Sequence, residues 1–249
     1  MFTHYTCTFC TYFCPMRQHL SHPCIPTRAT AVPTGPGWLH ELKHDGFRLI
    51  LQREGERVRL FTRRGHDWSD RYPLISAAAR RLKTSSFVID GEAVWLDDHG
   101  LADFDRLQSR RHDDEVKLVA FDLLAVGGED IRREPLHARK VRLAKLLAKP
   151  RDAIQLVEHL DGEIGPQMFA QACRLGCEGI VSKRKDRAYQ AGRSPHWLKT
   201  KNPDAPAMRR VPPTRLSRQV QKLFHERTLA AIAVVRTVEL IAPEICTLS

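Results

Sequence analysis

Residues 41–48 read Glu-Leu-Lys-His-Asp-Gly-Phe-Arg, and they lie where a regular strand pattern begins. Lys43 can attack the α-phosphate of a nucleotide only as a free amine, a form that burial and nearby cations favour. Gly46 lets the backbone turn closely beside a ligand, and Arg48 offers a planar fork for phosphate or ribose oxygens. A surface lysine in an ordinary turn gives the same pattern, so the rest of the chain must decide between the two interpretations.

Outward from this stretch, strand patterns outnumber helix patterns. Alternation on both sides of Glu54-Gly55 indicates a β-hairpin. Strands are expected at residues 48–53, 57–63, 87–96, 117–124, 178–183 and 199–202. Adjacent hairpins with few helices predict an α+β fold, with antiparallel sheets flanked by helices, and disfavour a doubly wound parallel sheet.

Three helices are expected, at residues 73–83, 137–149 and 165–175. Pro73 stands in the first turn of the first helix, Pro150 ends the second, and Gly176 stops the third. The second helix is amphipathic, and its apolar positions are expected to face inward; they are Val141, Leu143, Leu146 and Leu147.

The chain divides into three segments by composition. Residues 1–22 are predicted to be a disordered leader, and residues 23–203 to form one domain that starts with a proline- and glycine-rich extended lead-in at 23–37. Residues 204–249 are predicted to be a basic tail containing one helix at most. No stretch approaches the roughly 18 apolar residues that span a bilayer, and no signal-peptide pattern is present, so a cytosolic location without membrane contact is expected.

The charge balance favours a polyanionic partner. Lys and Arg total 40 against 29 Asp and Glu, a formal net charge of +11. Neutralising phosphates releases counterions, so such an excess is typical of nucleic-acid binding. A basic surface that only aids solubility is the alternative, and charge alone does not separate the two.

Cysteines are concentrated near the start of the chain. Cys7, Cys10, Cys14 and Cys24 form a cluster with His19 and His22 that has the donor types of a zinc site. The spacing fits no zinc-finger pattern well, so a disordered extension is the preferred interpretation. Cys173 and Cys177 are interpreted as small core residues.

Several charged residues flank or interrupt apolar strands. Glu92 and Glu178 would be costly to bury without a cation, and together they could hold Mg²⁺ (or Mn²⁺) beside a triphosphate. Lys183, Lys199 and Lys201 could neutralise the α-phosphate and the departing pyrophosphate. Lys199 and Lys201 alternate, so both face one side of a strand. Solvated acids in a turn and a basic sheet edge are the alternative interpretations.

These motifs occur in a characteristic order. It runs Lys-x-Asp-Gly-x-Arg (43–48), Asp-Gly-Glu (90–92), Phe-Asp (121–122), Glu-Gly-Ile-Val-x-Lys (178–183) and Lys-x-Lys (199–201). The order resembles motifs I, III, IIIa, IV and V of the covalent nucleotidyltransferases. Within that superfamily, residues 23–203 look most like the ligase domain of bacterial ATP-dependent DNA ligases of the end-joining type. The resemblance implies an ATP-grasp-like nucleotidyltransferase fold.

The resemblance also implies a role for each matching residue. Lys43 would form the lysyl-AMP phosphoramidate, and Glu178 would help to bind the divalent metal. Residues 62–65 resemble motif Ia, although Arg64 stands where the family usually has asparagine. The remaining implied contacts are Glu41 along the adenine pocket, Arg48 and Glu92 at the ribose, Phe121 stacked on adenine, Lys183, Lys199 and Lys201 at the phosphates, and Arg63 at nucleotide or DNA phosphate.

The implied function is the sealing of nicked or broken double-stranded DNA with ATP, in repair or end joining near the bacterial nucleoid. Complete ligases of this kind follow motif V with an OB-fold domain of roughly a hundred residues, whereas 46 residues follow Pro203 here. The OB-fold domain is therefore expected to be absent, activity to be slow, and a separate OB-fold or end-joining partner to be needed. An RNA ligase or capping-type transferase, and a degenerate remnant that binds nucleic acid without catalysis, are the alternatives.

Overall fold

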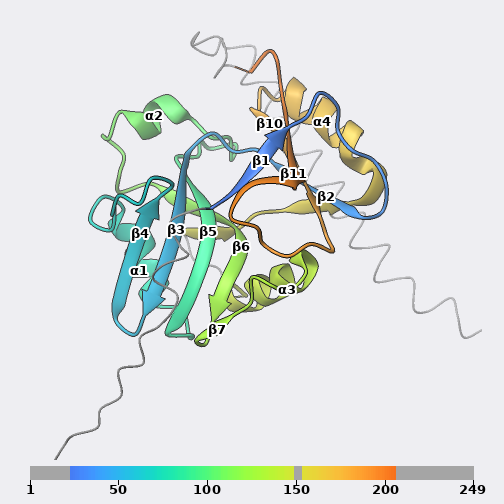
Figure 1. The fold of residues 1–249 in the computed structure, drawn as a ribbon. Coiled ribbons are helices and arrows are strands. Elements are labelled where there is room, and N and C mark those ends of the chain that lie inside the picture. Colours follow the sequence, from blue (N-terminus) through green and yellow to red (C-terminus); the bar gives the residue numbers. More distant parts are fainter. Residues whose placement is uncertain (1–22, 149–152, 206–249) are drawn as a thin grey trace, which may run out of the picture.

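A computed structural model describes residues 23–148 and 153–205, which form two β-sheets with helices packed around them (Figure 1). The strands of the first sheet have the order β1-β11-β10-β2-β9, and those of the second β4-β3-β5-β6-β7, with β8 also paired to β6. The elements are β1 Cys24–Arg28, β2 Trp38–Leu42, β3 Phe47–Glu54, β4 Arg57–Thr62, α1 Pro73–Arg80, β5 Ser86–Val94, α2 Phe104–Gln108, β6 Lys117–Val126, β7 Glu129–Asp130, α3 Leu136–Leu146, β8 Ile154–Leu156, β9 His159–Asp161, a 3₁₀ helix Gly162–Ile164, α4 Gly165–Arg174, β10 Gly179–Arg184 and β11 Gly192–Lys201.

The second sheet is built on the predicted hairpin. Strands β3 and β4 pair in an antiparallel register, and Gly55 takes the positive φ of +57° that the turn requires. Alternate residues of β3, Leu49 and Leu51, are fully buried in the main core, which α1 and α3 help to close. The α+β prediction is confirmed, because strand pairs are antiparallel except for β1 with β11 and β6 with β8.

The first sheet joins segments from both ends of the described chain. Part of the predicted extended lead-in is strand β1, which pairs in parallel with β11. Strand β10 lies between β2 and β11, and α4 packs against β10 and β2. The sheet therefore brings the stretch around Lys43 next to β10 and β11, which lie side by side in Figure 1.

Helix α3 shows where the amphipathic pattern failed. Val141, predicted to face inward, is 53% exposed, whereas Leu143 is fully buried as expected. Leu146 and Leu147 pack partly buried against the main core. The inward face also carries Arg139 and Lys140, which are 0% and 5% exposed. A pattern based on hydropathy assigns charged residues to solvent. It cannot predict that buried carboxylates from other elements will pair with them.

The cysteine predictions are only partly met. Cys24 is buried in β1, and the other members of the possible zinc cluster lie outside the described residues, so that alternative stays untested. Cys173 and Cys177 are free thiols, and both are partly buried instead of lying in the core. Burial raises the pKa of Cys177 to about 11, so this thiol stays protonated at neutral pH.

The terminal predictions fall outside the description. The predicted leader at 1–22 and nearly all of the predicted tail, from residue 206 onward, belong to the segments that the structure does not describe. Among the helices within 23–148 and 153–205, none has the length and apolar character that crossing a bilayer takes.

Candidate active site

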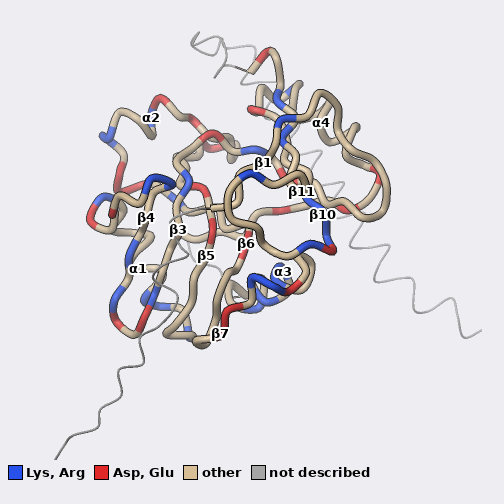
Figure 2. Tube along the Cα trace, in the orientation of Figure 1, with Lys and Arg blue, Asp and Glu red and all other residues tan. Residues whose placement is uncertain are grey.

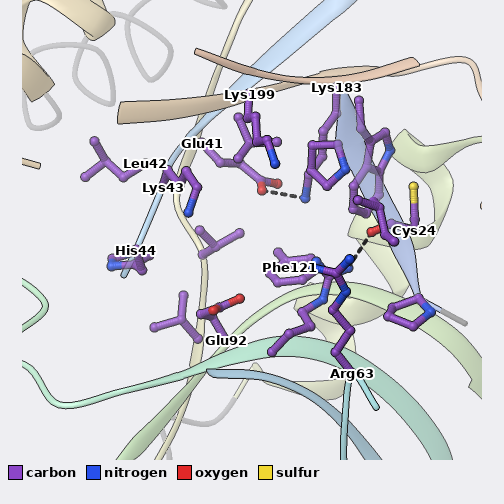
Figure 3. Close-up of a pocket in the computed structure, with 18 residues that line it drawn as sticks. Cys24, Glu41, Leu42, Lys43, His44, Arg63, Glu92, Phe121, Lys183 and Lys199 are labelled. Atoms are coloured by element: carbon purple, nitrogen blue, oxygen red, sulfur yellow. Dashed lines mark hydrogen bonds and ion pairs between the residues drawn. The ribbon is translucent and has the colours of Figure 1, made fainter. Parts of the chain in front are cut away.

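A cleft lined by both sheets gathers the residues that the motifs singled out (Figure 3). From the first sheet and the residue after β2 come Glu41, Lys43, Lys183 and Lys199. From the second sheet and the residue after β4 come Arg48, Arg63, Glu92 and Phe121. The two other predicted site residues lie beside the cleft: Glu178 forms an ion pair with Lys43, and Lys201 forms one with Glu178.

Strand register explains why the lysines share one side of the first sheet. Glu41 pairs with a β10 residue whose other neighbour is Lys199 on β11, so the three positions form one row across the sheet. Side chains in such a row project from the same face, as do those two residues along each strand. Lys183 and Lys201 therefore point to the same side as Lys199, and all three predicted phosphate-binding lysines are brought together.

Lys43 is held by a carboxylate and has a cationic neighbour. Its Nζ contacts Oε2 of Glu178, and Nζ of Lys201 lies 2.8 Å from the other oxygen of that carboxylate. The next residue, Gly179, has a φ of +138°, and a Cβ there would lie 2.1 Å from the carbonyl oxygen of Thr200. Glycine at this position therefore allows β10 and β11 to approach closely enough for this ion cluster to form.

The electrostatics of this cluster suit phosphate chemistry. Burial raises the pKa of Glu178, but Lys43 and Lys201 outweigh burial and hold that pKa below its ordinary value. Burial, reinforced by the charges of Lys43 and Lys201, lowers the pKa of Lys199. Cations that crowd one another in this way are stabilised by an incoming polyanion, so the cluster is prepared to receive phosphate groups.

Arg48 is anchored beside the predicted stacking residue. Its Nε and Nη2 lie 2.5 and 2.7 Å from the carboxylate oxygens of Asp90, and Nη2 also donates to the carbonyl oxygen of Cys24 at 3.2 Å. The guanidinium carbon lies 4.4 Å from the ring centroid of Phe121. The Asp90 of the Asp-Gly-Glu motif therefore meets the cation that its burial requires, and it fixes Arg48 at the cleft.

Two aromatic residues extend the surface formed by Phe121. Trp197 packs edge-on against it, with ring centroids 6.1 Å apart at 80°, and Tyr189 packs edge-on against Trp197. The hydroxyl of Tyr189 donates to Asp90 at 2.6 Å. The sequence patterns gave Trp197 no role. Only the fold shows that it is 2% exposed and lines the cleft.

Basic residues lie on both sides of this cleft. Figure 2 shows Lys and Arg on β4 in one sheet and on β10 and β11 in the other. Arg63, which follows β4, lines the cleft opposite the lysines of the first sheet. A polyanion entering the cleft would therefore meet cations from both sheets.

Glu92 is the acid of the cleft whose ionisation the fold disfavours. Burial raises the pKa of Glu92 to about 7, although Arg48 and Lys43 counteract the rise. In the unfolded chain the same carboxyl ionises near pH 4.5. The folded state therefore binds more protons than the unfolded state between these two values, so Glu92 lowers stability as the pH rises from about 4.5 to about 7.

Replacing Glu92 with glutamine is expected to stabilise the nucleotide-free and metal-free protein at pH 8 and to change it little at pH 5. A pKa unit corresponds to about 1.4 kcal/mol, and partial exposure reduces the effect, so about 1–2 kcal/mol is expected at pH 8. Thermal melts at both pH values in the presence of a chelator measure it. The exposed Glu163, changed to glutamine, serves as the control. An equal gain for Glu92→Gln at pH 5 and pH 8 would contradict this assignment.

The predicted metal ligands need a substrate to complete a site. Within residues 23–148 and 153–205, no group of three or more His, Cys, Asp or Glu side chains is arranged to hold an ion by itself. Mg²⁺ is commonly held by one or two carboxylates together with phosphate oxygens and water. The carboxylates of Glu92, in the cleft, and Glu178, beside it, supply the required donor type, so they fit a metal that arrives with a triphosphate.

One buried cation at the site was missed altogether. Lys140 on α3 forms an ion pair with Glu41, whose other oxygen lies 2.5 Å from Nζ of Lys183. The sequence offered one signal, a lysine next to an arginine on a helix that must pack against a sheet. Neither residue could be placed without the fold, because the partners of Lys140 and Arg139 lie 99 and 17 residues away.

Comparison with known proteins agrees with this geometry. Residues 20–201 match the model of the ATP dependent DNA ligase domain family, which is most of the chain. The chain belongs to the ATP-dependent DNA ligase family. The expected nucleotidyltransferase fold is confirmed by a solved structure, a mycobacterial DNA ligase D complexed with ATP and MES, with a TM-score of 0.64 and 34% identity over 72% of this chain and 60% of that one.

Several curated relatives of this ligase-family chain are bacterial end-joining proteins. The multifunctional non-homologous end joining protein LigD of Pseudomonas aeruginosa is 39% identical over 191 residues, which cover 75% of this chain and 22% of that protein. LigD of Mycobacterium tuberculosis is 39% identical over 168 residues, covering 66% of this chain and 22% of that protein. This ligase-family chain is thus homologous to LigD, and it spans about a fifth of the length of these relatives.

Proposed function

We propose that this chain carries the nucleotidyltransferase core of an ATP-dependent DNA ligase. The observation that carries the proposal is the cluster in which Lys43 contacts Glu178, with Lys199 and Lys201 beside it and Phe121 across the cleft. A nucleophile, phosphate-binding cations and an aromatic surface for a base thus occupy one cleft. Family membership and the LigD homology agree with this reading.

The proposed reaction begins with Lys43. Its neutral Nζ attacks the α-phosphorus of ATP, the bond to the β-phosphate oxygen breaks, and pyrophosphate leaves as the lysyl-AMP bond forms. Lys199 and Lys201 bind the α-phosphate and stabilise the charge that develops in the transition state, assisted by Lys183. Mg²⁺ (or Mn²⁺), held by Glu92, Glu178 and the nucleotide phosphates, would supply further charge neutralisation when bound.

The AMP group then passes to DNA. The 5′-phosphate at a nick or break attacks the lysyl-AMP phosphorus, which returns the amine of Lys43 as leaving group and leaves AMP joined to the DNA end. The 3′-hydroxyl then attacks that DNA phosphate and expels AMP. Arg63, on the opposite side of the cleft from the lysines, is proposed to contact nucleotide or DNA phosphate.

The remaining roles concern the nucleoside. Phe121 is proposed to stack on adenine, Glu41 to lie along the base, and Arg48 and Glu92 to approach the ribose. In the absence of nucleotide, Arg48 lies over the ring of Phe121 and is paired with Asp90. Base stacking on that face would therefore require the Arg48 guanidinium to shift or the base to share the ring with it.

The test is covalent labelling followed by sealing. Protein incubated with α-labelled ATP and Mg²⁺ is expected to give an acid-stable adduct that pyrophosphate reverses. Labelling by GTP instead would favour a capping-type transferase, and sealing of nicked RNA over nicked DNA would favour an RNA ligase. Salt-dependent DNA binding without any adduct would contradict the proposal and favour a non-catalytic remnant.

The proposed biological setting follows from the substrate. Broken or nicked DNA places the protein at the bacterial nucleoid, in the cytoplasm. A separate OB-fold protein or an end-joining protein is a further proposed partner. Addition of an OB-fold partner is expected to raise both the rate of lysyl-AMP formation and the rate of sealing.

A further inference from the structure

Lys140 is a buried cation that the proposed reaction does not use. It lies on α3, outside the cleft lining, and its side chain is 5% exposed. Its Nζ contacts Oε1 of Glu41, which is 4% exposed on β2 and does line the cleft. A lysine held away from water needs a compensating charge, and Glu41 supplies it across two elements that are far apart in sequence.

Glu41 is fixed between two ammonium groups. Lys140 contacts one of its oxygens, and Lys183 lies 2.5 Å from the other. Burial raises the pKa of Glu41, but Lys140 and Lys183 outweigh burial and hold that pKa below its ordinary value. An ionised carboxylate accepts up to about four hydrogen bonds and donates none, so acceptor capacity is left over. Figure 3 shows the Glu41 carboxylate directed into the cleft.

The two cations are not equivalent. Nζ of Lys183 also lies 4.2 Å from the ring centroid of Phe121 and 4.1 Å from that of Trp197. A base that stacks on Phe121 would compete for this aromatic surface, and the contacts of Lys183 would change. Lys140 touches the carboxylate from outside the cleft. It is therefore the partner of Glu41 that base binding leaves in place.

We propose that Lys140 is a positioning residue for base specificity, which fixes the Glu41 carboxylate so that it accepts a hydrogen bond from the 6-amino group of adenine. This inference rests on the proposed function. Guanine carries an oxygen acceptor where adenine carries that amino donor, so an acceptor-only carboxylate repels it. A site built around a buried hydrogen bond discriminates strongly against a ligand that cannot make it.

The test compares the affinities of the Lys140→Met variant for ATP and for GTP, expressed as a ratio. Methionine fills a similar volume, and the charges of Glu41 and Lys183, which remain, balance each other. The fold is therefore expected to survive. Affinity for ATP should fall at least tenfold, affinity for GTP less than threefold, and the rate of adduct formation at saturating ATP less than threefold. Lys140→Arg keeps the charge and should restore the ratio to within threefold of wild type. Lys145→Met, an exposed lysine on the same helix, is the matched control.

The outcomes separate this inference from the proposed function. An unchanged ratio in Lys140→Met, or equal losses for both nucleotides, would overturn the positioning role. If the methionine variant does not fold, Lys140→Gln is measured in its place with the same expected loss of ratio. If the wild-type protein forms no adduct with any nucleotide, the proposed function fails, while equilibrium binding of ATP and GTP still decides the role of Lys140.

Discussion

Lys43→Arg will form no covalent adduct with ATP, a loss of at least about a thousandfold relative to the wild-type protein. Arginine keeps the positive charge and can still pair with Glu178, so the ion cluster and the fold are expected to persist. Its guanidinium does not lose a proton under any condition a protein tolerates, so it presents no lone pair to the α-phosphorus. Gel detection of α-labelled AMP on the protein measures the effect, with Lys43→Ala alongside.

The control is Lys185→Ala, because Lys185 pairs with Asp161 on the surface and does not line the cleft. It should label at the wild-type rate. A second readout separates chemistry from folding: DNA whose 5′ end already carries AMP no longer needs attack by Lys43. Lys43→Arg should therefore seal such a nick measurably while failing on unmodified nicks. Equal labelling of the wild-type protein and Lys43→Arg would mean that another residue is the nucleophile.

Asp122→Ala will destabilise the protein by about 3–5 kcal/mol, the cost of leaving a buried charge without its partner. Asp122 and Arg139 are both 0% exposed, and two parallel hydrogen bonds of 2.8 Å join them. Arg139 also donates to the carbonyl oxygens of Glu134 and Arg187. Denaturant unfolding of the variant measures the loss in stability.

The exposed pair of Arg132 and Asp130 is the matched control, because it has similar bidentate geometry. Asp130→Ala should cost less than about 1 kcal/mol, since water screens exposed pairs. The double variant Asp122→Leu with Arg139→Met should recover much of the stability that Asp122→Ala loses, because no uncompensated charge remains. A loss below 1 kcal/mol for Asp122→Ala would show that the buried pair does not hold α3 against β6.

This pair also connects stability to the site. Asp122 follows Phe121 directly in β6 and pairs across the sheet with Asp90 beside a register irregularity, so its side chain projects from the face that carries Asp90. Arg139 therefore fixes β6 directly beside Phe121, which lines the cleft. Its neighbour Lys140 reaches Glu41. Two successive residues of α3 thus tie that helix to both sheets, and loosening α3 is expected to affect base binding as well as folding.

Local sequence carried much of the fold. The alternation on both sides of Gly55 predicted β3 and β4, and the apolar runs predicted β5, β6 and β10, because a strand with a buried face must repeat every second residue. The short β1, embedded among prolines, was read only as extended. Its strand character comes from pairing with the distant strand β11, where Cys24 lies opposite Gly192, and no local pattern encodes this.

The motif residues could likewise be identified from the sequence, although their arrangement in space could not. Lys43, Glu92, Phe121 and the lysines near residue 200 were singled out by residue type and order, and all of them are in or beside the cleft. The contacts that each side chain makes could not be predicted from residue type and order. Arg48 was expected at a ribose, whereas in the free protein it pairs with Asp90 and covers Phe121. Such contacts depend on which strands become neighbours.

The amino-acid sequence by itself determined the chemistry available here: a lysine nucleophile, acids and cations in a fixed order, and strands whose alternation sets the side each residue faces. Only the tertiary structure decided that Lys140 and Arg139 point inward, because a helical pattern sends charges to water unless a distant carboxylate compensates for burial. It also decided the pKa of Glu92, since burial beneath two sheets is a property of their packing and not of any one segment.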